Sequence, residues 1–157
     1  MFKRRGTKHM FKKENKGFTI IEVLIVLAIA GLIMLIVFLA VPALQRNSRN
    51  TSIKNDAQLF AGAVGDHRAS YNGTTPTVTE GTGTITLSGG GTSTVTLNGS
   101  TPVAIPTDKP NADTMVPGTL YVASGRDCNY SQSARTVAIW FVTETSGSGE
   151  AVQCIEG

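Results

Sequence analysis

The sequence predicts an α+β protein in which one long N-terminal helix packs against a small antiparallel β-sheet. Three observations support this prediction. Apolar residues fill 23 of the 27 positions from Phe18 to Leu44. An apolar stripe with helical spacing follows them. Five short segments with the alternation of half-buried strands then lie between residues 83 and 155.

The charges divide the chain of 157 residues into two unlike parts. Residues 1–17 hold seven basic side chains and one acid, a net charge of +6, whereas residues 18–157 hold seven bases and ten acids, a net charge of −3. The formal total of +3 therefore describes neither part. Because binding along nucleic acid depends on neutralising phosphates with Lys and Arg, the net charge does not support nucleic acid as a general partner. Any such contact would need a local basic patch.

The N-terminal apolar segment is long enough to cross a membrane. Val23 to Val41 is a run of 19 residues without a charged side chain, which spans roughly 29 Å as a helix, about the thickness of the hydrocarbon core. The basic residues before it predict a cytoplasmic N-terminus. No small-residue signal-peptidase site follows Val41. We therefore expect a retained, single-pass segment.

The junction before this segment has two unusual residues. Gly17 puts a flexible, small residue at the membrane edge, where it would admit a protease to the backbone. Glu22 places a carboxylate in the apolar helix. Inserting a charged side chain at the middle of a membrane costs roughly 2.5–3.5 kcal/mol, and the cost is smaller near the interface. If the chain were cut after Gly17, the new amine of Phe18 could pair with Glu22 of a neighbouring copy. The alternative is a Glu22 solvated among the headgroups.

The segment KGFTIIEVLIVLAIAG, residues 16–31, resembles the leader-peptidase site and N-terminal helix of type IV pilins and the related pseudopilins. The resemblance depends on four features that occur together: the basic leader, the Gly-Phe-Thr junction, the glutamate at the fifth position of the mature chain, and the uncharged apolar run. It implies a type IV pilin-like fold and cleavage by prepilin peptidase between Gly17 and Phe18. It also implies N-methylation of Phe18 and an assembly role for Glu22.

The resemblance further implies a structural subunit that is not an enzyme. Such a subunit is a single-pass precursor in the cytoplasmic membrane and later a homopolymer in a helical, extracellular pilus or fimbrium. The implied partners are membrane lipid before assembly, prepilin peptidase, an inner-membrane platform protein and an assembly ATPase. The implied roles are adhesion, motility or DNA uptake.

Two alternatives lie near this interpretation. One is a pseudopilin of a type II secretion system. The other is a competence pilin that binds DNA phosphates through local arginines, for which the candidates are Arg46, Arg49, Arg126 and Arg135.

Two features depart from the common family pattern. Pro42 falls about one helical turn later than the helix-bending proline of many members, which leaves the position of any kink open. The leader has two possible starts, because Met1-Phe2-Lys3 recurs as Met10-Phe11-Lys12. Cleavage after Gly17 would give the same mature chain of 140 residues from either start.

The predicted organisation has four parts. Residues 1–17 form a cleaved leader, residues 18–44 the transmembrane and filament-core helix, residues 45–70 its amphipathic continuation, and residues 71–157 an exported, β-rich head. The continuation is predicted from an apolar stripe, and we expect the helix to end near Ser70, before the turn pair Asn72-Gly73. The stripe consists of Ile53, Ala57, Phe60 and Val64.

The strands are predicted from alternation. Residues 83–87 and 93–97 form a hairpin through a glycine-rich turn at residues 88–92, with Ile85, Leu87, Val95 and Leu97 on one face. Three further strands follow a proline-rich connection, at residues 119–123, 136–143 and 151–155. Trp140 and Phe141 are adjacent, so they should face opposite sides of the sheet.

The two cysteines, Cys128 and Cys154, are predicted to form a disulfide. They lie 26 residues apart in the portion expected outside the cytoplasm, where disulfides persist. Closing this loop would stabilise the fold by roughly 3.5 kcal/mol in the chain-entropy model. A metal or catalytic pair is disfavoured because the spacing is not CxxC. The family resemblance implies a C-terminal disulfide loop of this kind.

No cofactor is expected, and the candidate chemistry is sparse. His67 beside Asp66 suggests a hydrolytic site with Ser70, but adjacent helix residues point about 100° apart, so an exposed helix histidine is expected. Asp108 and Asp113 are weak candidates for calcium, because they lack the alternating oxygen ligands of an EF-hand.

The basic residues after the apolar segment have several candidate partners. Arg46, Arg49 and Lys54 are expected to contact headgroups or to pair with acids such as Asp56, ahead of contacting DNA.

Overall fold

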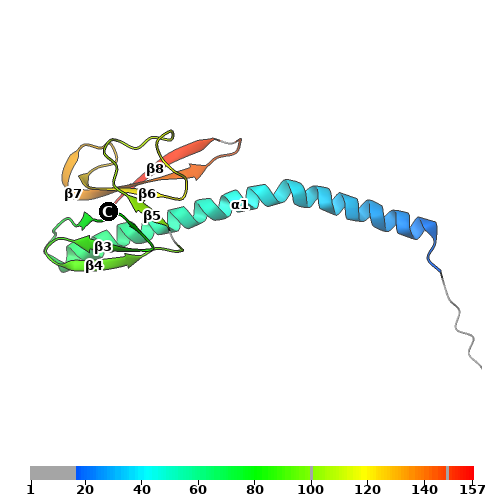
Figure 1. The fold of residues 1–157 in the computed structure, drawn as a ribbon, viewed down its shortest axis with the longest axis horizontal. Helices are drawn as coiled ribbons and strands as arrows, with labels where there is room; N and C mark the ends of the chain where they lie inside the picture. The colour runs from blue at the N-terminus through cyan, green and yellow to red at the C-terminus, as the bar shows by residue number, and fades with distance from the viewer. Residues whose placement is uncertain (1–16, 100, 148) are drawn as a thin grey trace, which may run out of the picture. The chain divides into compact units, whose positions relative to one another are not determined.

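The computed structural model describes residues 17–99, 101–147 and 149–157. The chain divides into two compact units, residues 1–41 and residues 42–157. The predicted leader lies outside the described residues except for Gly17. The elements, shown in Figure 1, are α1 (Ile20–Ser70), β1 (Thr77–Val78), β2 (Gly81–Thr82), β3 (Thr84–Ser88), β4 (Thr92–Thr96), β5 (Pro102–Ala104), β6 (Leu120–Arg126), β7 (Gln132–Glu144) and β8 (Glu150–Glu156).

Helix α1 has 51 residues and includes Pro42. It ends at Ser70, as the Asn72-Gly73 pair predicts. Asn72 takes the left-handed conformation with φ of 54°, and the Gly73 N–H donates to the Arg68 carbonyl at 2.7 Å. This bond satisfies a carbonyl that the helix end would leave free.

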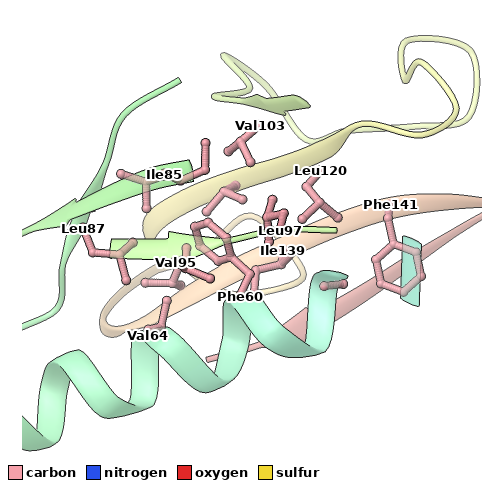
Figure 2. Close-up of a cluster of buried hydrophobic side chains, with 14 of the residues drawn as sticks. Phe60, Val64, Ile85, Leu87, Val95, Leu97, Val103, Leu120, Ile139 and Phe141 are labelled. Carbon is pink, nitrogen blue, oxygen red and sulfur yellow. The ribbon is translucent and has the colours of Figure 1, made fainter. Parts of the chain in front are cut away.

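The second unit buries the predicted stripe of the helix. Ile53 is 5% exposed, and Ala57, Phe60 and Val64 are fully buried. These side chains belong to one core cluster with apolar residues of β3, β4, β6 and β7. Figure 2 shows Phe60 and Val64 of the helix directed toward the labelled residues of these strands. Deleting a side chain as large as Phe60 from such a core typically destabilises a fold by about 3–5 kcal/mol.

The strands form two sheets, so the prediction of a single antiparallel sheet is wrong in this respect. The first sheet has the order β1-β3-β4, and the second has the order β2-β5-β6-β7-β8. All pairs are antiparallel except β5 and β6, which are parallel. The parallel pair arises because the proline-rich connection contains a strand that the sequence did not reveal. That strand begins with Pro102, a position where the missing N–H is tolerated.

The hairpin is confirmed with the predicted face. Strands β3 and β4 pair Ile85 with Val95 and Ser88 with Thr92. The predicted apolar side chains all belong to the core cluster with the helix: Ile85, Leu87, Val95 and Leu97.

The adjacent aromatic residues of β7 face opposite sides of the second sheet, as predicted. Phe141 joins the core against the helix, whereas Trp140 joins a second cluster on the other face. Both are buried, at 3% and 1% exposure. The second cluster is completed by Met115 from the loop between β5 and β6. Each face of this sheet therefore has its own apolar packing.

The glycine-rich turn between β3 and β4 is a packing surface for the end of the helix. A Cβ at Gly91 would lie 1.9 Å from the Tyr71 ring, so only glycine fits beneath that ring. The Tyr71 hydroxyl donates to the Thr92 carbonyl at 3.0 Å. The turn is thus ordered by contact with the residue after α1.

Candidate assembly site

The first part of α1 exposes its apolar side chains. The large apolar residues from Phe18 to Leu44 are all between 39% and 90% exposed, and the highest value is that of Phe18. The stripe that the second unit buries begins only at Ile53. The helix contains an 18-residue window with a mean hydropathy of 3.3, none of it buried, so it is long and apolar enough to cross a membrane. This surface needs lipid or another apolar partner.

The predicted cleavage point precedes the helix. Residues 17–19 have no regular structure, and Gly17 and Phe18 are exposed. A Cβ added at Gly17 would meet no atom within 4 Å. Within the described chain, folding therefore does not require glycine at this position. If glycine is required at position 17, the requirement would come from a molecule that recognises this junction, such as a protease.

Thr19 and Glu22 form a reciprocal cap at the start of α1. The backbone N–H and the hydroxyl of Thr19 each donate to Glu22 Oε2 at 2.7 Å. The Glu22 N–H donates in return to Thr19 Oγ1 at 3.3 Å. This is the capping-box arrangement, in which an N-cap hydroxyl and a glutamate three residues later satisfy N–H groups that the helix leaves free.

The capping box adds a role for Glu22 that the sequence interpretation missed. The Thr-x-x-Glu spacing before an apolar run was a readable signal. Both Thr19 donors use Oε2, so within the described residues Oε1 accepts no hydrogen bond and stays open to a cation. Capping and pairing with an amine are therefore compatible.

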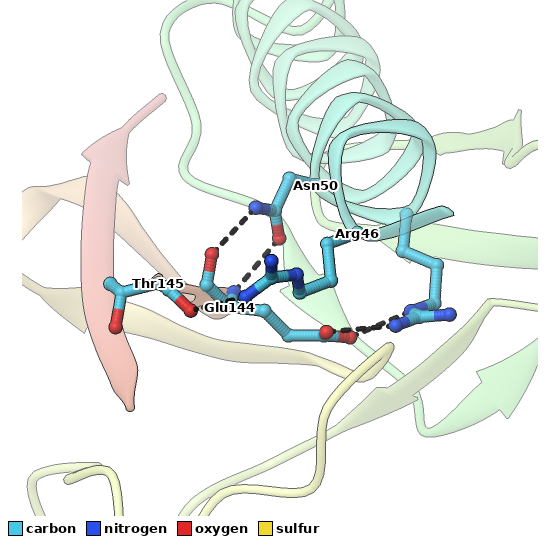
Figure 3. Close-up of polar contacts among 5 residues, drawn as sticks. Arg46, Asn50, Glu144 and Thr145 are labelled. Atoms are coloured by element: carbon cyan, nitrogen blue, oxygen red, sulfur yellow. Dashed lines mark hydrogen bonds and ion pairs between the residues drawn. The ribbon is translucent and has the colours of Figure 1, made fainter. Parts of the chain in front are cut away.

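A polar clamp joins α1 to the end of β7, and we define it as Arg46, Arg49 and Asn50 on the helix with Glu144, the last residue of β7, and Thr145, which follows the strand (Figure 3). Arg49 donates to both carboxylate oxygens of Glu144, at 2.6 and 2.8 Å. Arg46 donates to the Thr145 carbonyl at 3.2 Å. Asn50 pairs with the backbone of Glu144.

The ion pair in the polar clamp shifts the pKa of both Arg49 and Glu144. The hydrogen bond from Arg49 lowers the pKa of Glu144 below its ordinary value of 4.5, and the charges of Arg49 and Arg46 add to this effect. The same bond raises the pKa of Arg49. The Arg49 and Glu144 side chains are 59% and 27% exposed, so solvent screens their attraction.

Asp56 does not pair with a nearby base, and the expectation that it would is wrong. It is 1% exposed and faces the loop after β4. Its Oδ1 accepts from the Asn98 N–H at 2.8 Å and from Asn98 Nδ2 at 2.9 Å, and its Oδ2 accepts from the Thr101 hydroxyl at 2.5 Å. Asp56 therefore fixes the connection from the first sheet to the second. Lys54 is exposed on the helix.

His67 is buried, and the expectation of an exposed histidine is wrong. Its exposure is 1%, and it fits beneath the hairpin turn. Nε2 lies 2.8 Å from the Gly89 carbonyl and Nδ1 lies 2.7 Å from Ser93 Oγ. Because a carbonyl only accepts, Nε2 carries the proton and, in the neutral ring, Nδ1 accepts from the Ser93 hydroxyl.

The imagined hydrolytic site is not assembled from the predicted residues. Asp66 and Ser70 are exposed, whereas His67 bonds to the turn of the hairpin. Its partners come from a segment 22 to 26 residues away. The sequence could not reveal them, because helical spacing places His67 but not the strand packed on it.

The predicted disulfide between Cys128 and Cys154 is present, with the Cα atoms 5.8 Å apart. It links the loop after β6 to β8. The Cys128 N–H also donates to Glu156 Oε1 at 2.9 Å. The C-terminal strand is thus held to this loop by a covalent bond and a hydrogen bond.

The calcium candidates, Asp108 and Asp113, are both exposed in the loop between β5 and β6. In residues 17–99, 101–147 and 149–157, no group of three or more His, Cys, Asp or Glu residues is placed to hold a metal ion. Asn111 orders part of this loop, because its Oδ1 accepts from the N–H groups of Asp113 and Thr114 at 3.0 Å.

Comparison with known proteins identifies the N-terminal segment. Residues 12–38 match the family model of the prokaryotic N-terminal methylation motif, the class III signal of type IV pilins and pseudopilins. The comparison found no similar protein of curated function and no similar solved structure. The motif indicates a type IV pilin-like or pseudopilin protein, and the α+β fold, with a long apolar helix packed on sheets, is that of type IV pilins.

Proposed function

We propose that this chain is a structural subunit of a type IV pilus-like filament. It is made as a membrane precursor with the basic leader in the cytoplasm. Prepilin peptidase cuts between Gly17 and Phe18, and Phe18 becomes N-methylated. The mature subunit then polymerises through its N-terminal helix into an extracellular fibre.

The observation that carries this proposal is the methylation motif at the start of a helix with exposed apolar side chains. A helix of this hydropathy is stable in lipid or in contact with other apolar helices, but not in water. Lipid covers the apolar side chains of this helix before assembly, and the helices of neighbouring subunits cover them in the filament core afterwards. One surface thereby serves both states of the subunit.

Glu22 has a place in this proposal that depends on its cap. Thr19 holds Oε2 of Glu22 at the N-terminal end of the helix, and Glu22 would be the fifth residue of the cleaved chain. A carboxylate fixed there can meet the amine of Phe18 on a neighbouring subunit through Oε1. In an apolar environment, a charge pair of this kind is much stronger than in water. It would set the axial register of each incoming subunit.

The arginines offer little support for a DNA-binding competence pilin. Arg46 and Arg49 are engaged in the polar clamp. Arg126 donates to the Tyr130 carbonyl at 3.1 Å and lies 4.7 Å from the centroid of the Tyr130 ring. Arg135 is exposed. A phosphate-binding surface would have to take three of these four side chains away from contacts within the chain.

The disulfide favours a surface pilus over a secretion pseudopilus. A C-terminal disulfide loop of this kind is a feature of many type IV pilins, and it survives outside the cell, where the head of a surface fibre is exposed. The loop between β5 and β6 bears acids but groups only Asp108 and Asp113, which gives the pseudopilin alternative little support.

Processing can be tested by producing the full chain in membranes with and without a prepilin peptidase. Mass spectrometry should show loss of residues 1–17 only when the peptidase is present. Gly17→Val should stay uncut, and the open space around Gly17 means that the fold tolerates this change. Val23→Ala is the matched control and should be cut normally. An uncut wild-type chain, or cutting at another bond, would contradict the proposal.

A further inference from the structure

Two strands of the second unit, β4 and β8, have an open edge. Within the described chain, β4 is the last strand of the first sheet and β8 is the last strand of the second sheet. Native proteins usually protect such edges with lysine, proline or a bulge, because an open edge pairs with other chains. Residues 92–96 and 151–155 contain no lysine and no proline, and their pairing with β3 and β7 shows no bulge. Both edges can therefore accept a further strand.

The open edge of β4 faces a groove beside α1. The Leu97 N–H donates to the Gly83 carbonyl at 2.8 Å, so the alternation of an antiparallel pair directs the backbone groups of Thr94 and Thr96 away from β3. The groove on that side has a volume of about 700 Å³, and both threonines line it with residues of the helix. Both threonines are exposed.

Side chains of the helix region bond to this edge at both ends of the groove. The Tyr71 hydroxyl donates to the Thr92 carbonyl at 3.0 Å, and Asp56 Oδ1 accepts from the Asn98 N–H at 2.8 Å. The start of β4 therefore lies beside the end of the helix, and β4 runs antiparallel to α1. The backbone groups between these two bonds remain open.

β8 runs in the same direction as the helix. Glu150 pairs with Glu144, which the polar clamp holds to Asn50 of the helix. At the other end, a Cβ added to Gly157 would lie 3.1 Å from the Ala61 Cα. Because Glu150 lies near Asn50 and Gly157 lies against Ala61, β8 and α1 are parallel.

The two open edges lie on opposite flanks of the helix. Asp56 bonds to the segment after β4, and Ala61 contacts the residue after β8. At 100° per residue, Asp56 lies about 40° to one side of the buried Phe60, and Ala61 lies about 100° to the other side. A neighbouring copy on one flank can therefore present its β8 edge to the β4 groove.

The open edge of β8 consists of the backbone groups of Val152 and Cys154. Val137 and Gly157 exchange both backbone hydrogen bonds, so alternate residues counted from Gly157 bond to β7. The backbone groups of Val152 and Cys154 are therefore directed away from β7. Their side chains pack against the second apolar cluster, on the sheet face away from the helix.

We propose that β4 of each subunit pairs antiparallel with β8 of a neighbouring copy, an inference that rests on the proposed function. Copies that leave one membrane share one orientation, so their helices are parallel and β4 of one copy runs opposite to β8 of the next. Thr94 then lies opposite Cys154, and Thr96 lies opposite Val152. All four side chains point away from the helices, as residues opposite each other in a sheet do.

Two opposite charges support this register. Asp66 lines the groove and Lys54 lies on the flank of Ala61, seven residues further along the helix. Both are exposed, and the ion pair found within the described residues does not include either of them. Lys54 lies about 10 Å before Ala61 in the helix, as far as Cys154 lies before the end of β8. Pairing Cys154 with Thr94 therefore brings Lys54 of the neighbour near Asp66.

A disulfide cross-link tests the pairing in filaments of the full chain, produced in cells that carry the assembly proteins. The double variant Thr96→Cys/Val152→Cys places two thiols in a directly opposed pair, where the Cα atoms are about 5.5 Å apart, within reach of a disulfide. Sheared filaments should give a ladder of covalent multimers that collapses on reduction. Peptide mapping should show the link between positions 96 and 152 and an intact Cys128–Cys154 bond.

The matched control is Thr86→Cys/Val152→Cys. Thr86 lies opposite Thr94 on the same face, but in β3, one strand further from the edge, so no ladder is expected. Wild-type filaments without the link in the Thr96→Cys/Val152→Cys variant, or with an equal link in the control, would overturn this inference and leave the proposed function intact. Absence of filaments from the wild type would overturn both.

A charge exchange tests the register without cysteines, and it decides if the double cysteine variant does not assemble. Lys54→Asp and Asp66→Lys each place like charges together and should lower the yield of sheared filaments about threefold or more. The combined variant restores opposite charges and should recover the wild-type yield. Lys109→Asp, an exposed base in the loop between β5 and β6, is the control and should have no effect. Normal yields from both single variants, or no recovery in the combined variant, would contradict the proposed register.

Discussion

The side chain of Asn50 pairs with both backbone groups of Glu144. Its Nδ2 donates to the Glu144 carbonyl and its Oδ1 accepts from the Glu144 N–H, each at 2.8 Å. A helix side chain thus takes the place of a neighbouring strand at the end of β7. Together with Arg46 and Arg49, it fixes the helix to the head only a few residues after Pro42. We therefore expect the head to hold the helix from Arg46 onward.

Asn50→Leu should destabilise the head by about 1–3 kcal/mol, because two partly buried backbone groups lose their partner. Thermal unfolding of the full chain in detergent measures this, with the fluorescence of the single, buried Trp140 as the probe. Asn55→Leu is a matched control at an exposed helix position. Equal stability of Asn50→Leu and wild type would show that the pairing contributes nothing.

The pH dependence of stability should reveal the Arg49–Glu144 pair. The folded pKa of Glu144 is lowered, mainly by the Arg49 bond, so folding favours the ionised carboxylate. This stabilisation is complete above the ordinary pKa of 4.5 and is lost as the pH falls through the lower, folded value. The stability difference between wild type and Glu144→Gln should therefore narrow below about pH 4.5. A difference that stays constant down to full protonation would exclude the pair as its source.

His67→Leu should destabilise the head by about 1–3 kcal/mol, because the Gly89 carbonyl and the Ser93 hydroxyl would lose their partner in a buried site. The unfolding assay with Trp140 applies here too. Asp66→Leu, one position away and exposed, should change stability by less than about 0.5 kcal/mol. A similar small change in both variants would mean that the His67 bonds do not hold the hairpin to the helix.

Two substitutions separate the capping and pairing roles of Glu22. Glu22→Gln keeps a capping-box residue but removes the charge, whereas Glu22→Val removes both. If the charge registers subunits, both variants should be cut by prepilin peptidase, yet both should assemble poorly. Electron microscopy of sheared surface material, with quantification of the subunit, gives the readout. Normal filaments from Glu22→Gln would assign Glu22 to helix capping alone.

The sequence predicted the elements that depend on local pattern. Three elements could each be predicted from a short stretch of sequence: the apolar stripe from Ile53 to Val64, the helix end before Asn72-Gly73, and the alternation of Ile85 and Leu87. Sequence spacing also indicated the cysteine pair, because the chain offers no other cysteine.

The missed features depend on contacts between distant segments. The burial of Asp56 and His67 arises from loops and strands that pack over the helix, and helical spacing alone cannot show which polar residue will be covered. The division into two sheets and the parallel pairing of β5 with β6 depend on which strands lie side by side, which no local pattern indicates. The polar clamp joins residues 94 to 99 positions apart. The capping box at Thr19 and Glu22 is a local pattern that the sequence prediction did not include.

The central claim is that the chain is cut after Gly17 and polymerised through the helix that follows. N-terminal sequencing of the subunit from sheared surface filaments tests both parts at once. The account predicts N-methylated Phe18 as the first residue, followed by Thr19. A filament subunit that begins at Met1 or Met10, or a chain that is never recovered in filaments, would contradict it.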